Sequence, residues 1–228
     1  MLGRLSSLRR AYRSLYGWAT GRLYHELAWG YEIVAWMVSL GRWDAWRCQA
    51  LDHVIGRRVL EIGFGAGVLL ETAADRGILI FGADPSSEMH RVASRRLRRS
   101  SRRAPRVRAT AQLLPFTDGS FDTVISTFPS GYIFDPDSLN EATRVLSRSV
   151  DGGGPGRLVI TGLGFRSDRP WLLRLLRALF AGSDTDSVAW YAGRVAELGF
   201  QVTVVDDAAT PVRVPALILQ WPARSEEV

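Results

Sequence analysis

The chain has 228 residues, of which 46% are hydrophobic and 23% are charged, proportions typical of a globular protein with a sizeable core. Its net charge of +6 is carried by arginine, because the sequence contains no lysine; a basic balance is compatible with anionic partners but does not bear on the fold. The single cysteine, Cys48, excludes a disulfide scaffold and a cysteine-rich metal site, and it favours the reducing cytoplasm.

The N-terminal segment is rich in aromatic side chains and has a helical pattern. We predict that residues 1–56 form a helical cap and that residues 57–228 form the main domain, the two making one structural unit. The N-terminus is basic but lacks the uninterrupted apolar run of a signal peptide. The longest apolar stretch nearby, residues 31–43, is too short to span a bilayer. We therefore expect a cytoplasmic protein, with peripheral membrane contact left open.

From residue 57 onward, short apolar runs alternate with helical segments. Strands are predicted at 57–63, 78–84, 105–111, 121–128, 156–163, 200–207 and 211–221, and helices at 66–77, 86–100, 137–149, 169–180 and 184–199. This alternation predicts an α/β fold with a doubly wound, Rossmann-like sheet of seven mostly parallel strands. The link between the last two strands is too short for a parallel crossover, so the final strand is expected to be antiparallel.

The first strand runs into a loop with glycines at alternate positions, Gly63, Gly65 and Gly67. In an open parallel sheet, ligands bind beyond the carboxyl ends of the strands, and glycines there let backbone amides approach a ligand. Glu61 lies at the strand–loop junction, and Asp84 ends the second strand, where it can accept both ribose hydroxyls of an adenosine ligand. The glycine spacing is not G-x-G-x-x-G, and Glu61 would repel a pyrophosphate. The loop therefore favours an adenosine ligand without phosphate over a dinucleotide, with a plain strand-to-helix turn as the alternative.

The glycine loop and Asp84 belong to longer motifs, and a third motif follows them. The three are "VLEIGFGAG" (59–67), "GADPSSEM" (82–89) and "LLPFTDGSFDTVIST" (113–127). Together they resemble the class I S-adenosylmethionine-dependent methyltransferases, in particular the methyltransferase type 11 group that includes quinone-biosynthesis enzymes. Upstream, "YHELAWGYE" (24–32) resembles the helix that precedes the fold in that group, with His25 and Glu32 in place of its acids. The resemblance extends over roughly residues 20–220, and the family also has an antiparallel last strand.

The resemblance implies that the cofactor is S-adenosyl-L-methionine. It implies that the cofactor-binding residues are Tyr31, Glu61, Gly63, Gly65, Gly67, Asp84, Pro85, Ser86, Met89, Thr110, Ala111, Gln112, Thr127 and Phe128. The glycine loop would pass beneath the methionine and ribose, Glu61 would organise that loop, and Asp84 would bind the ribose hydroxyls. Pro85, Ser86 and Met89 would flank the adenosine.

The adenine contact departs from the pattern of the family. Relatives commonly have an acid near Thr110 for the adenine amino group; this sequence has threonine there, and Gln112 can replace the acid. Thr127 and Phe128, after the fourth strand, would lie under the transferable methyl group.

The sequence offers no certain general base and no metal site. Methyl transfer from a sulfonium is an in-line displacement that alignment can accelerate, and a base is needed only for a poorly ionised acceptor. His25, in the helix that would cap the cofactor, and Tyr132, after the fourth strand, are the catalytic candidates; a structural role is the alternative for each. His90 is expected at the surface.

Residues 169–180 carry one broad apolar face, made by Trp171, Leu172, Leu175, Leu176, Leu179 and Phe180. An ordinary helix packed on the sheet would have this pattern. So would a lid over a hydrophobic acceptor such as a quinone or lipid-like molecule, which could also touch a membrane surface.

Residues 91–108 hold nine arginines. Such a run could bind RNA or anionic lipid. It lacks interleaved aromatic residues for base stacking, so nucleic acid is disfavoured and a solvated helix face is favoured.

The sequence thus predicts an enzyme, an S-adenosylmethionine-dependent methyltransferase with a small hydrophobic acceptor. An NAD(P)-dependent oxidoreductase would use the same kind of sheet, but the glycine spacing and the terminal strand pair argue against it. A non-catalytic protein that binds S-adenosylmethionine is the other alternative.

Overall fold

The computed structural model describes residues 42–151, 153–171, 173–174, 185–206 and 212–221. The chain divides into two compact units, Met1–Trp43 and Asp44–Val228, and the described residues belong almost entirely to the second. The predicted helical cap falls largely outside the described residues, so the boundary at residue 56 stays a prediction. No helix of the described part has the length and apolarity that a membrane span requires.

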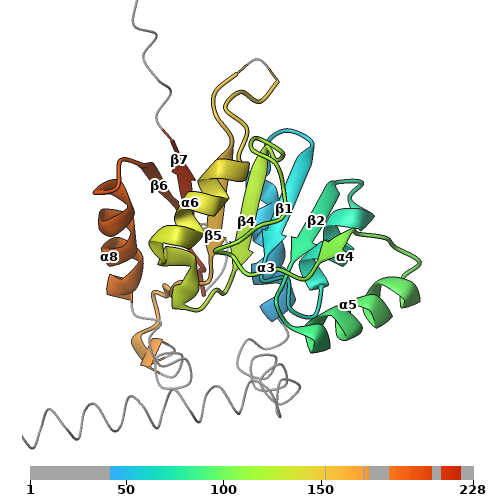
Figure 1. The fold of residues 1–228 in the computed structure, drawn as a ribbon. Helices are drawn as coiled ribbons and strands as arrows, with labels where there is room; N and C mark the ends of the chain where they lie inside the picture. Colours follow the sequence, from blue (N-terminus) through green and yellow to red (C-terminus); the bar gives the residue numbers. More distant parts are fainter. Residues whose placement is uncertain (1–41, 152, 172, 175–184, 207–211, 222–228) are drawn as a thin grey trace, which may run out of the picture. The chain divides into compact units, whose positions relative to one another are not determined.

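The described residues form strands and helices in the predicted order (Figure 1). The bounds are α3 (Trp43–Cys48), the 3-10 helix η1 (Gln49–His53), β1 (Arg58–Ile62), α4 (Val68–Asp75), β2 (Leu79–Ala83), α5 (Ser87–Arg99), β3 (Arg106–Val107), β4 (Thr123–Thr127), the 3-10 helix η2 (Gly131–Phe134), α6 (Pro136–Val145), β5 (Arg157–Thr161), α8 (Thr185–Ala196), β6 (Gln201–Val205) and β7 (Ala216–Gln220).

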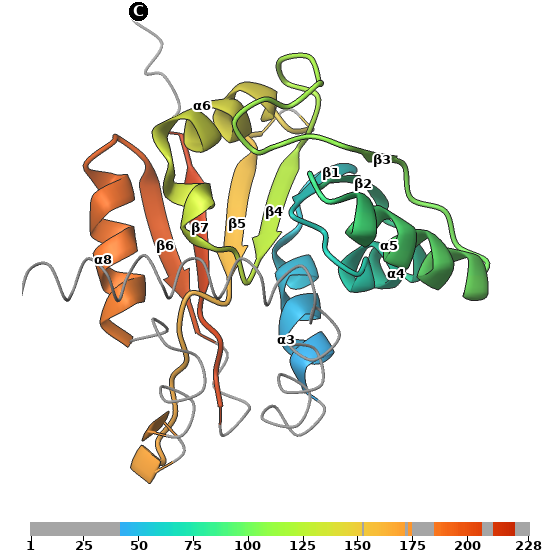
Figure 2. The same ribbon diagram turned by 60° about the horizontal axis from the view of Figure 1, so that its bottom comes forward.

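The seven strands make one sheet in the order β3-β2-β1-β4-β5-β7-β6. Every pair is parallel except those of β7, which runs antiparallel to both β5 and β6. Helices cover both faces of the sheet (Figure 2). The prediction of a doubly wound sheet with an antiparallel last strand is confirmed.

The alternation of side chains along β1 divides the core into two layers. Leu60 and Ile62 pack with residues of α6 and α8, whereas Val59 packs with residues of η1, α4 and α5. Because side chains in a strand alternate between faces, Glu61 points to the same side as Val59. The buried acid of the first strand therefore lies on the side of the sheet that α4 and α5 cover.

Local sequence signals account for two helix starts. Ser86 caps α5, since its hydroxyl accepts a hydrogen bond from Met89 N at 3.3 Å, and serine is a preferred residue at this position. Asp135 caps α6 by accepting from Asp137 N at 3.0 Å, with Pro136 at the first helical position. The helix predicted at 137–149 therefore begins and ends earlier than expected.

The third strand is shorter than predicted. Residues 105–111 were expected to be extended, but β3 contains only Arg106 and Val107, which pair with Gly82 and Ala83 at the edge of the sheet. Beyond β3 the chain turns back on itself, and Thr110 forms an isolated bridge with Leu113. An edge strand has one neighbour, so its length depends on that neighbour as well as on its own composition.

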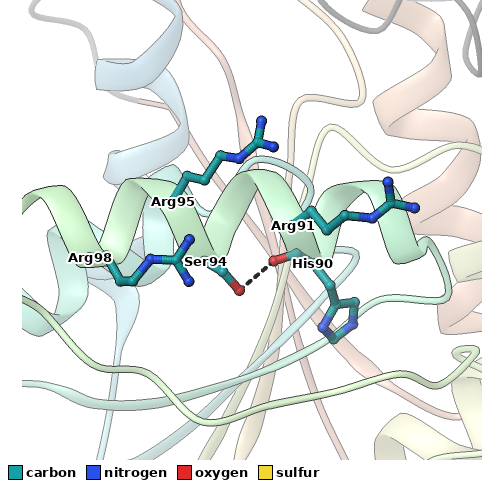
Figure 3. A pocket seen from close by; sticks show the side chains of 5 residues that line it. All are labelled: His90, Arg91, Ser94, Arg95 and Arg98. Carbon is teal, nitrogen blue, oxygen red and sulfur yellow. Dashed lines mark hydrogen bonds between the residues drawn. The ribbon is translucent and has the colours of Figure 1, made fainter.

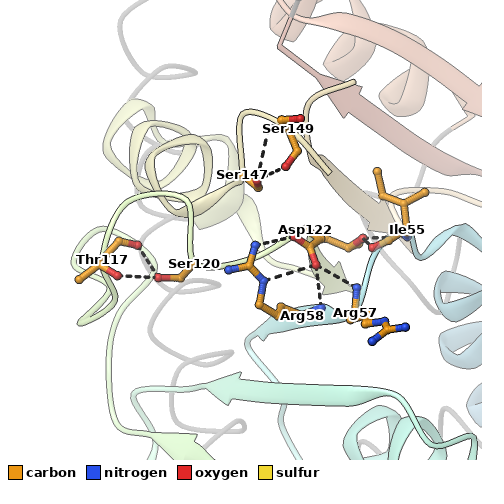
Figure 4. Close-up of polar contacts among 9 residues, drawn as sticks. Ile55, Arg57, Arg58, Thr117, Ser120, Asp122, Ser147 and Ser149 are labelled. Atoms are coloured by element: carbon orange, nitrogen blue, oxygen red, sulfur yellow. Dashed lines mark hydrogen bonds and ion pairs between the residues drawn. The ribbon is translucent and has the colours of Figure 1, made fainter. Parts of the chain in front are cut away.

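Asp122 holds the amino ends of β1 and β4 together (Figure 4). Its Oδ2 accepts from Arg57 N at 2.9 Å and Arg58 N at 3.0 Å, and its Oδ1 accepts from Arg58 Nη2 at 2.7 Å. Burial alone would raise the pKa of Asp122, but the hydrogen bonds from Arg58 and Arg57 outweigh it and hold the pKa below its usual value. Next to it, Thr123 Oγ1 accepts from Ile55 N at 2.9 Å.

Replacing Asp122 with alanine is expected to lower the free energy of unfolding by about 2–4 kcal/mol, because two backbone N–H groups and a guanidinium lose their acceptor. The native pKa is depressed, so this stabilisation should be present above the unfolded-state pKa and lost as the pH falls through the native one. Urea denaturation followed by circular dichroism measures both effects.

Asp118→Ala is the matched control, because Asp118 also pairs with an arginine, Arg144, but its side chain is 81% exposed. It should cost about 1 kcal/mol or less. Equal losses in the two variants would contradict the role given to Asp122.

Candidate functional site

The carboxyl ends of β1, β2 and β4 meet at one edge of the sheet. From β1 the sheet extends through β2 to β3 on one side and through β4 to β5 on the other. The strand order therefore reverses between β1 and β4, which is where open α/β sheets bind ligands. The glycine loop between β1 and α4 lies at this position.

The three glycines of the loop all have a positive φ, of 75° at Gly63, 51° at Gly65 and 78° at Gly67. A Cβ at Gly63 would lie 2.4 Å from the hydroxyl of Tyr132, and one at Gly67 would lie 2.8 Å from Cβ of Ala93 in α5. A Cβ at Gly65 would meet nothing within 4 Å. Gly63 and Gly67 thus admit neighbouring protein atoms, and only Gly65 leaves its backbone open to a ligand.

Asp84 connects the end of β2 to this loop. Its side chain accepts from Gly65 N at 3.0 Å through Oδ2 and from Ser86 N at 2.9 Å through Oδ1. Its carbonyl accepts from His90 Nε2 at 3.0 Å, which requires the proton on that nitrogen. His90 is half-buried and lies edge-on to Phe64, with ring centroids 4.8 Å apart, so the predicted surface residue is only partly exposed.

Glu61 is the less exposed of the two acids of the site. Only 1% of the residue is exposed, and its Oε2 has no hydrogen-bond partner in the part of the chain that the structure describes. Burial raises the pKa of Glu61 to about 8, against the opposing charge of Arg47 and with a smaller contribution from Asp84. The carboxyl group is therefore mostly protonated at neutral pH.

Tyr132 lies behind the glycine loop. Its hydroxyl is 3.4 Å from the carbonyl oxygen of Ile62 and 3.3 Å from Oγ of Ser126. Ser126 itself donates to Ile62 O at 3.1 Å. Two hydroxyl groups on the η2 and β4 side therefore contact the backbone where β1 ends.

Phe128 follows β4 with a φ of 48°, which is uncommon for a bulky residue and is a form of strain often found at functional sites. Its N–H donates to Thr161 O at 2.7 Å. A Cβ at Gly162 would come within 2.4 Å of the Phe128 ring, so the glycine makes room for this conformation. Thr127, the last residue of β4, is 9% exposed.

The remaining predicted residues lie in the segments that follow β2 and β3. Pro85 is exposed, and Ser86 and Met89 are half-buried in and before the first turn of α5. After β3, Thr110 is exposed, while the two positions that follow it, Ala111 and Gln112, are buried and half-buried. The structure does not describe Tyr31, His25 or most of residues 169–180.

Sequence reasoning missed two residues that support the site, His90 and Ser126. The spacing contains a signal for the first, because His90 lies four residues after the cap Ser86 and so falls on the same face of the helix. Ser126 lies in the motif at residues 113–127, but its hydrogen-bond partner Ile62 is 64 positions away in the sequence. Only the pairing of β1 with β4 brings them together.

Comparison with known proteins agrees with this geometry. Residues 59–154 match the family described as a methyltransferase domain. The chain is 31% identical over 171 residues to a demethylmenaquinone methyltransferase from Thermobifida fusca, covering 67% of this chain and 70% of that protein. It is 32% identical over 142 residues to a demethylmenaquinone methyltransferase from Clavibacter sepedonicus, covering 60% of this chain and only 55% of that protein.

Solved structures share the fold. One is an S-adenosylmethionine-dependent methyltransferase from Thermotoga maritima, described as a possible histamine N-methyltransferase, with a TM-score of 0.57 and 21% identity, over 87% of this chain and 98% of that one. Another is the geranyl diphosphate C-methyltransferase from Streptomyces coelicolor, solved with S-adenosyl-L-homocysteine, with a TM-score of 0.56 and 16% identity, over 81% of each chain.

Gly63→Ala is expected to lower the free energy of unfolding by about 2–4 kcal/mol, since alanine disfavours a positive φ and its Cβ would overlap the Tyr132 hydroxyl. In a Tyr132→Phe background the overlap is gone, because the next Tyr132 atom would be 3.5 Å away. The cost of Gly63→Ala should then fall to about 1–2 kcal/mol, the strain of the backbone alone.

Chemical denaturation of the double-mutant cycle measures this difference. Gly65→Ala is the control, because it has the same sign of φ and no contact within 4 Å, so its cost should be equal in both backgrounds. A cost of Gly63→Ala that is unchanged by Tyr132→Phe would contradict the proximity of these two residues.

Proposed function

We propose, because this chain belongs to the S-adenosylmethionine-dependent methyltransferases, that it transfers the methyl group of that cofactor to a small hydrophobic acceptor with a quinone-like or phenolic ring. The observation that supports the cofactor site is the pair of buried acids at the carboxyl edge of the sheet. Glu61 and Asp84 flank the glycine loop there, 1% and 6% exposed. We propose that this loop and the two acids bind the cofactor.

The unpartnered oxygen of Glu61 fits a cationic ligand. S-adenosylmethionine carries a sulfonium and an ammonium group, and a buried carboxyl group without a partner is stabilised in its ionised form by a nearby cation. A pyrophosphate would instead oppose the ionisation of Glu61, because two negative charges would then lie together in a buried place. The side chain thus favours S-adenosylmethionine over NAD, and the oxidoreductase alternative is not favoured.

Asp84 keeps acceptor capacity for the ribose. Each of its oxygens accepts one backbone N–H, from Gly65 or Ser86, and a carboxylate oxygen has two acceptor positions. One position on each oxygen therefore remains for the two ribose hydroxyls. The open side of Gly65 lets the ligand approach the loop, while Pro85, Ser86 and Met89 would flank the adenosine.

When bound, S-adenosylmethionine supplies an electrophilic methyl group on sulfur. For the chain's own residues the task is to align the acceptor with that methyl group, since alignment can supply much of the acceleration. We propose that Thr127 and Phe128 form the floor of the transfer site, with Phe128 held in its strained conformation by Thr161. The hydroxyl of Tyr132 forms hydrogen bonds with Ile62 O and Ser126 Oγ. We therefore propose that Tyr132 supports the loop and does not act as a base.

The apolar character of the acceptor has two supports. Aromatic rings gather beside the end of β4, since Phe165 lies 6.4 Å from Phe128 and 5.5 Å from Trp46 between ring centroids. In addition, the relatives described above are demethylmenaquinone methyltransferases. A reduced naphthoquinone would offer an electron-rich ring whose hydroxyl ionises readily, which reduces the need for a protein base.

The proposed function is tested by incubating the protein with labelled S-adenosylmethionine and a panel of reduced naphthoquinones, phenols and small amines, with products identified by mass spectrometry. Methylation of a naphthoquinol or phenol is the expected result. Methylation of the amines alone would contradict the acceptor class.

Thermal shift with S-adenosylmethionine and NAD separates the alternatives, because a ligand of the native state raises the melting temperature. Stabilisation by S-adenosylmethionine without turnover on any acceptor would favour a non-catalytic binding protein. Stabilisation by NAD alone would contradict the methyltransferase proposal.

Cofactor binding at neutral pH is expected to release most of one proton. Glu61 has a pKa of about 8 without a cation, so it is mostly protonated at pH 7, and the cationic ligand should drive it to ionise. Calorimetry in two buffers of different ionisation enthalpy measures the released proton. Glu61→Gln should bind more weakly and release none.

S-adenosylhomocysteine is the matched ligand control, because its sulfur is uncharged and it should release a smaller fraction of a proton. The release from S-adenosylmethionine should vanish above pH 9 or so, where Glu61 is already ionised. Binding of S-adenosylmethionine without proton release at pH 7 would contradict the role of Glu61.

A further inference from the structure

The arginines between residues 91 and 108 divide into two groups. Five are held by neighbours: Arg91 by Glu88, Arg96 by Glu71, Arg102 by Asp75, Arg106 by Ser94 and Ala104, and Arg108 by Pro85. The guanidinium groups of the other four, Arg95, Arg98, Arg99 and Arg103, have no hydrogen bond or ion pair with any residue that the structure describes. A solvated helix face, as predicted, would leave these four positive charges without a neighbouring carboxylate among the described residues.

Three of these cations, Arg95, Arg98 and Arg99, lie on the outer side of α5, whereas Arg103 comes after the end of the helix. Arg91, Arg95 and Arg98 recur at the spacing of one helix face, and with His90 and Ser94 they line a shallow hollow of about 330 Å³ (Figure 3). Arg95 also lines a second hollow of about 400 Å³, together with Glu71, Val92, Arg96 and Arg99. Arg95 thus forms a ridge between two hollows, each with cationic walls.

The guanidinium groups spread along the helix and do not converge. In Figure 3, Arg95 points away from the helix on one side and the His90 ring on the other, whereas Arg91 and Arg98 extend along the helix. A single phosphate is best bound by donors that aim at one point. A row of cations along a helix of 13 residues, about 20 Å long, suits an extended anionic surface better.

The positive charge of Arg98 acts on its neighbour Arg106 in β3. Burial lowers the pKa of Arg106, and the charge of Arg98 lowers it further. An anionic surface over α5 would relieve this repulsion between neighbouring guanidinium groups.

Two kinds of extended polyanion would complement this face, RNA and an anionic bilayer. The described residues of α5 and of the segment from 100 to 108 include no aromatic ring apart from His90, which packs on Phe64, so bases have nothing to stack on. The large hydrophobic side chain exposed on α5 is Val92, at 38%. A hydrophobic acceptor would reside in a bilayer, and this preference for lipid rests on the proposed function.

We propose that the outer face of α5, with Arg95, Arg98 and Arg99 as its principal cations, binds the surface of an anionic phospholipid bilayer. The same helix begins at the candidate site, where Ser86 N and His90 Nε2 donate to Asp84. Lipid contact along α5 would therefore bring the methyltransferase to the phase that contains its acceptor, through residues that do not touch the cofactor.

The test is co-sedimentation of the full chain with vesicles of phosphatidylcholine alone and of phosphatidylcholine and phosphatidylglycerol in a three-to-one mixture. The wild type should pellet with the anionic vesicles only, and less so at high salt because the charges are screened. Each arginine at an anionic surface contributes about fivefold to partitioning, so the triple variant R95Q/R98Q/R99Q should lose on the order of a hundredfold.

A matched variant, R57Q/R148Q/R194Q, removes the same charge from exposed positions outside α5, and it should lose no more than about threefold, the effect of net charge alone. Melting temperatures establish that both variants are folded. Equal losses in the two variants, or pelleting with neutral vesicles, would overturn the proposal.

Two competition arms distinguish the other anions. Inorganic phosphate, added at constant ionic strength, should not displace the protein; displacement would indicate a discrete phosphate site instead. Single- and double-stranded RNA should bind more weakly than anionic vesicles, and tighter RNA binding that needs the same three arginines would overturn the lipid assignment. Pelleting requires no methyl acceptor, so failure here leaves the proposed function intact, and failure of the acceptor panel leaves lipid binding intact.

Discussion

The carboxylate of Asp84 connects two neighbouring strand ends, and the geometry of the candidate site depends on it. The glycine loop has few side chains to hold it, and its open residue, Gly65, is held by Oδ2 of Asp84 at 3.0 Å. The other oxygen holds the start of α5 through Ser86 N at 2.9 Å. A ligand that approaches the loop therefore meets a preorganised backbone and an acid that still has acceptor capacity.

The two ends of the sheet use buried acids in opposite ways. At the amino end, Asp122 accepts from two backbone amides and a guanidinium, which hold its pKa below the usual value. At the carboxyl end, Glu61 is buried, and its Oε2 has no partner among the residues that the structure describes. Its pKa is raised to about 8. A satisfied acid stabilises the fold, whereas an unsatisfied one destabilises it unless a cation binds.

The helix α5 extends from the candidate site to the surface of the protein. At its start, the hydroxyl of Ser86 caps the helix, and His90 Nε2 donates a hydrogen bond to the carbonyl oxygen of Asp84. Its inner side chains, Ala93 and Leu97, pack in the core, and its outer side presents arginines. One amphipathic helix thus contributes to the candidate site, the core and the proposed lipid contact.

The sequence by itself determined the element order, the antiparallel last strand, the glycine loop and the two acids, because each depends on local pattern: apolar runs, cap residues, glycine spacing and loop length. The tertiary structure alone decided what depends on residues far apart in the chain. The length of β3 is set by its pairing with β2, and the position of Tyr132 behind Gly63 by the packing of η2 on the end of β1. Only the fold shows which arginines form an ion pair with a carboxylate, such as Arg96 with Glu71, and which do not. The sequence gives the number of charges, but an ion pair depends on which side chains the packing of the helices brings together.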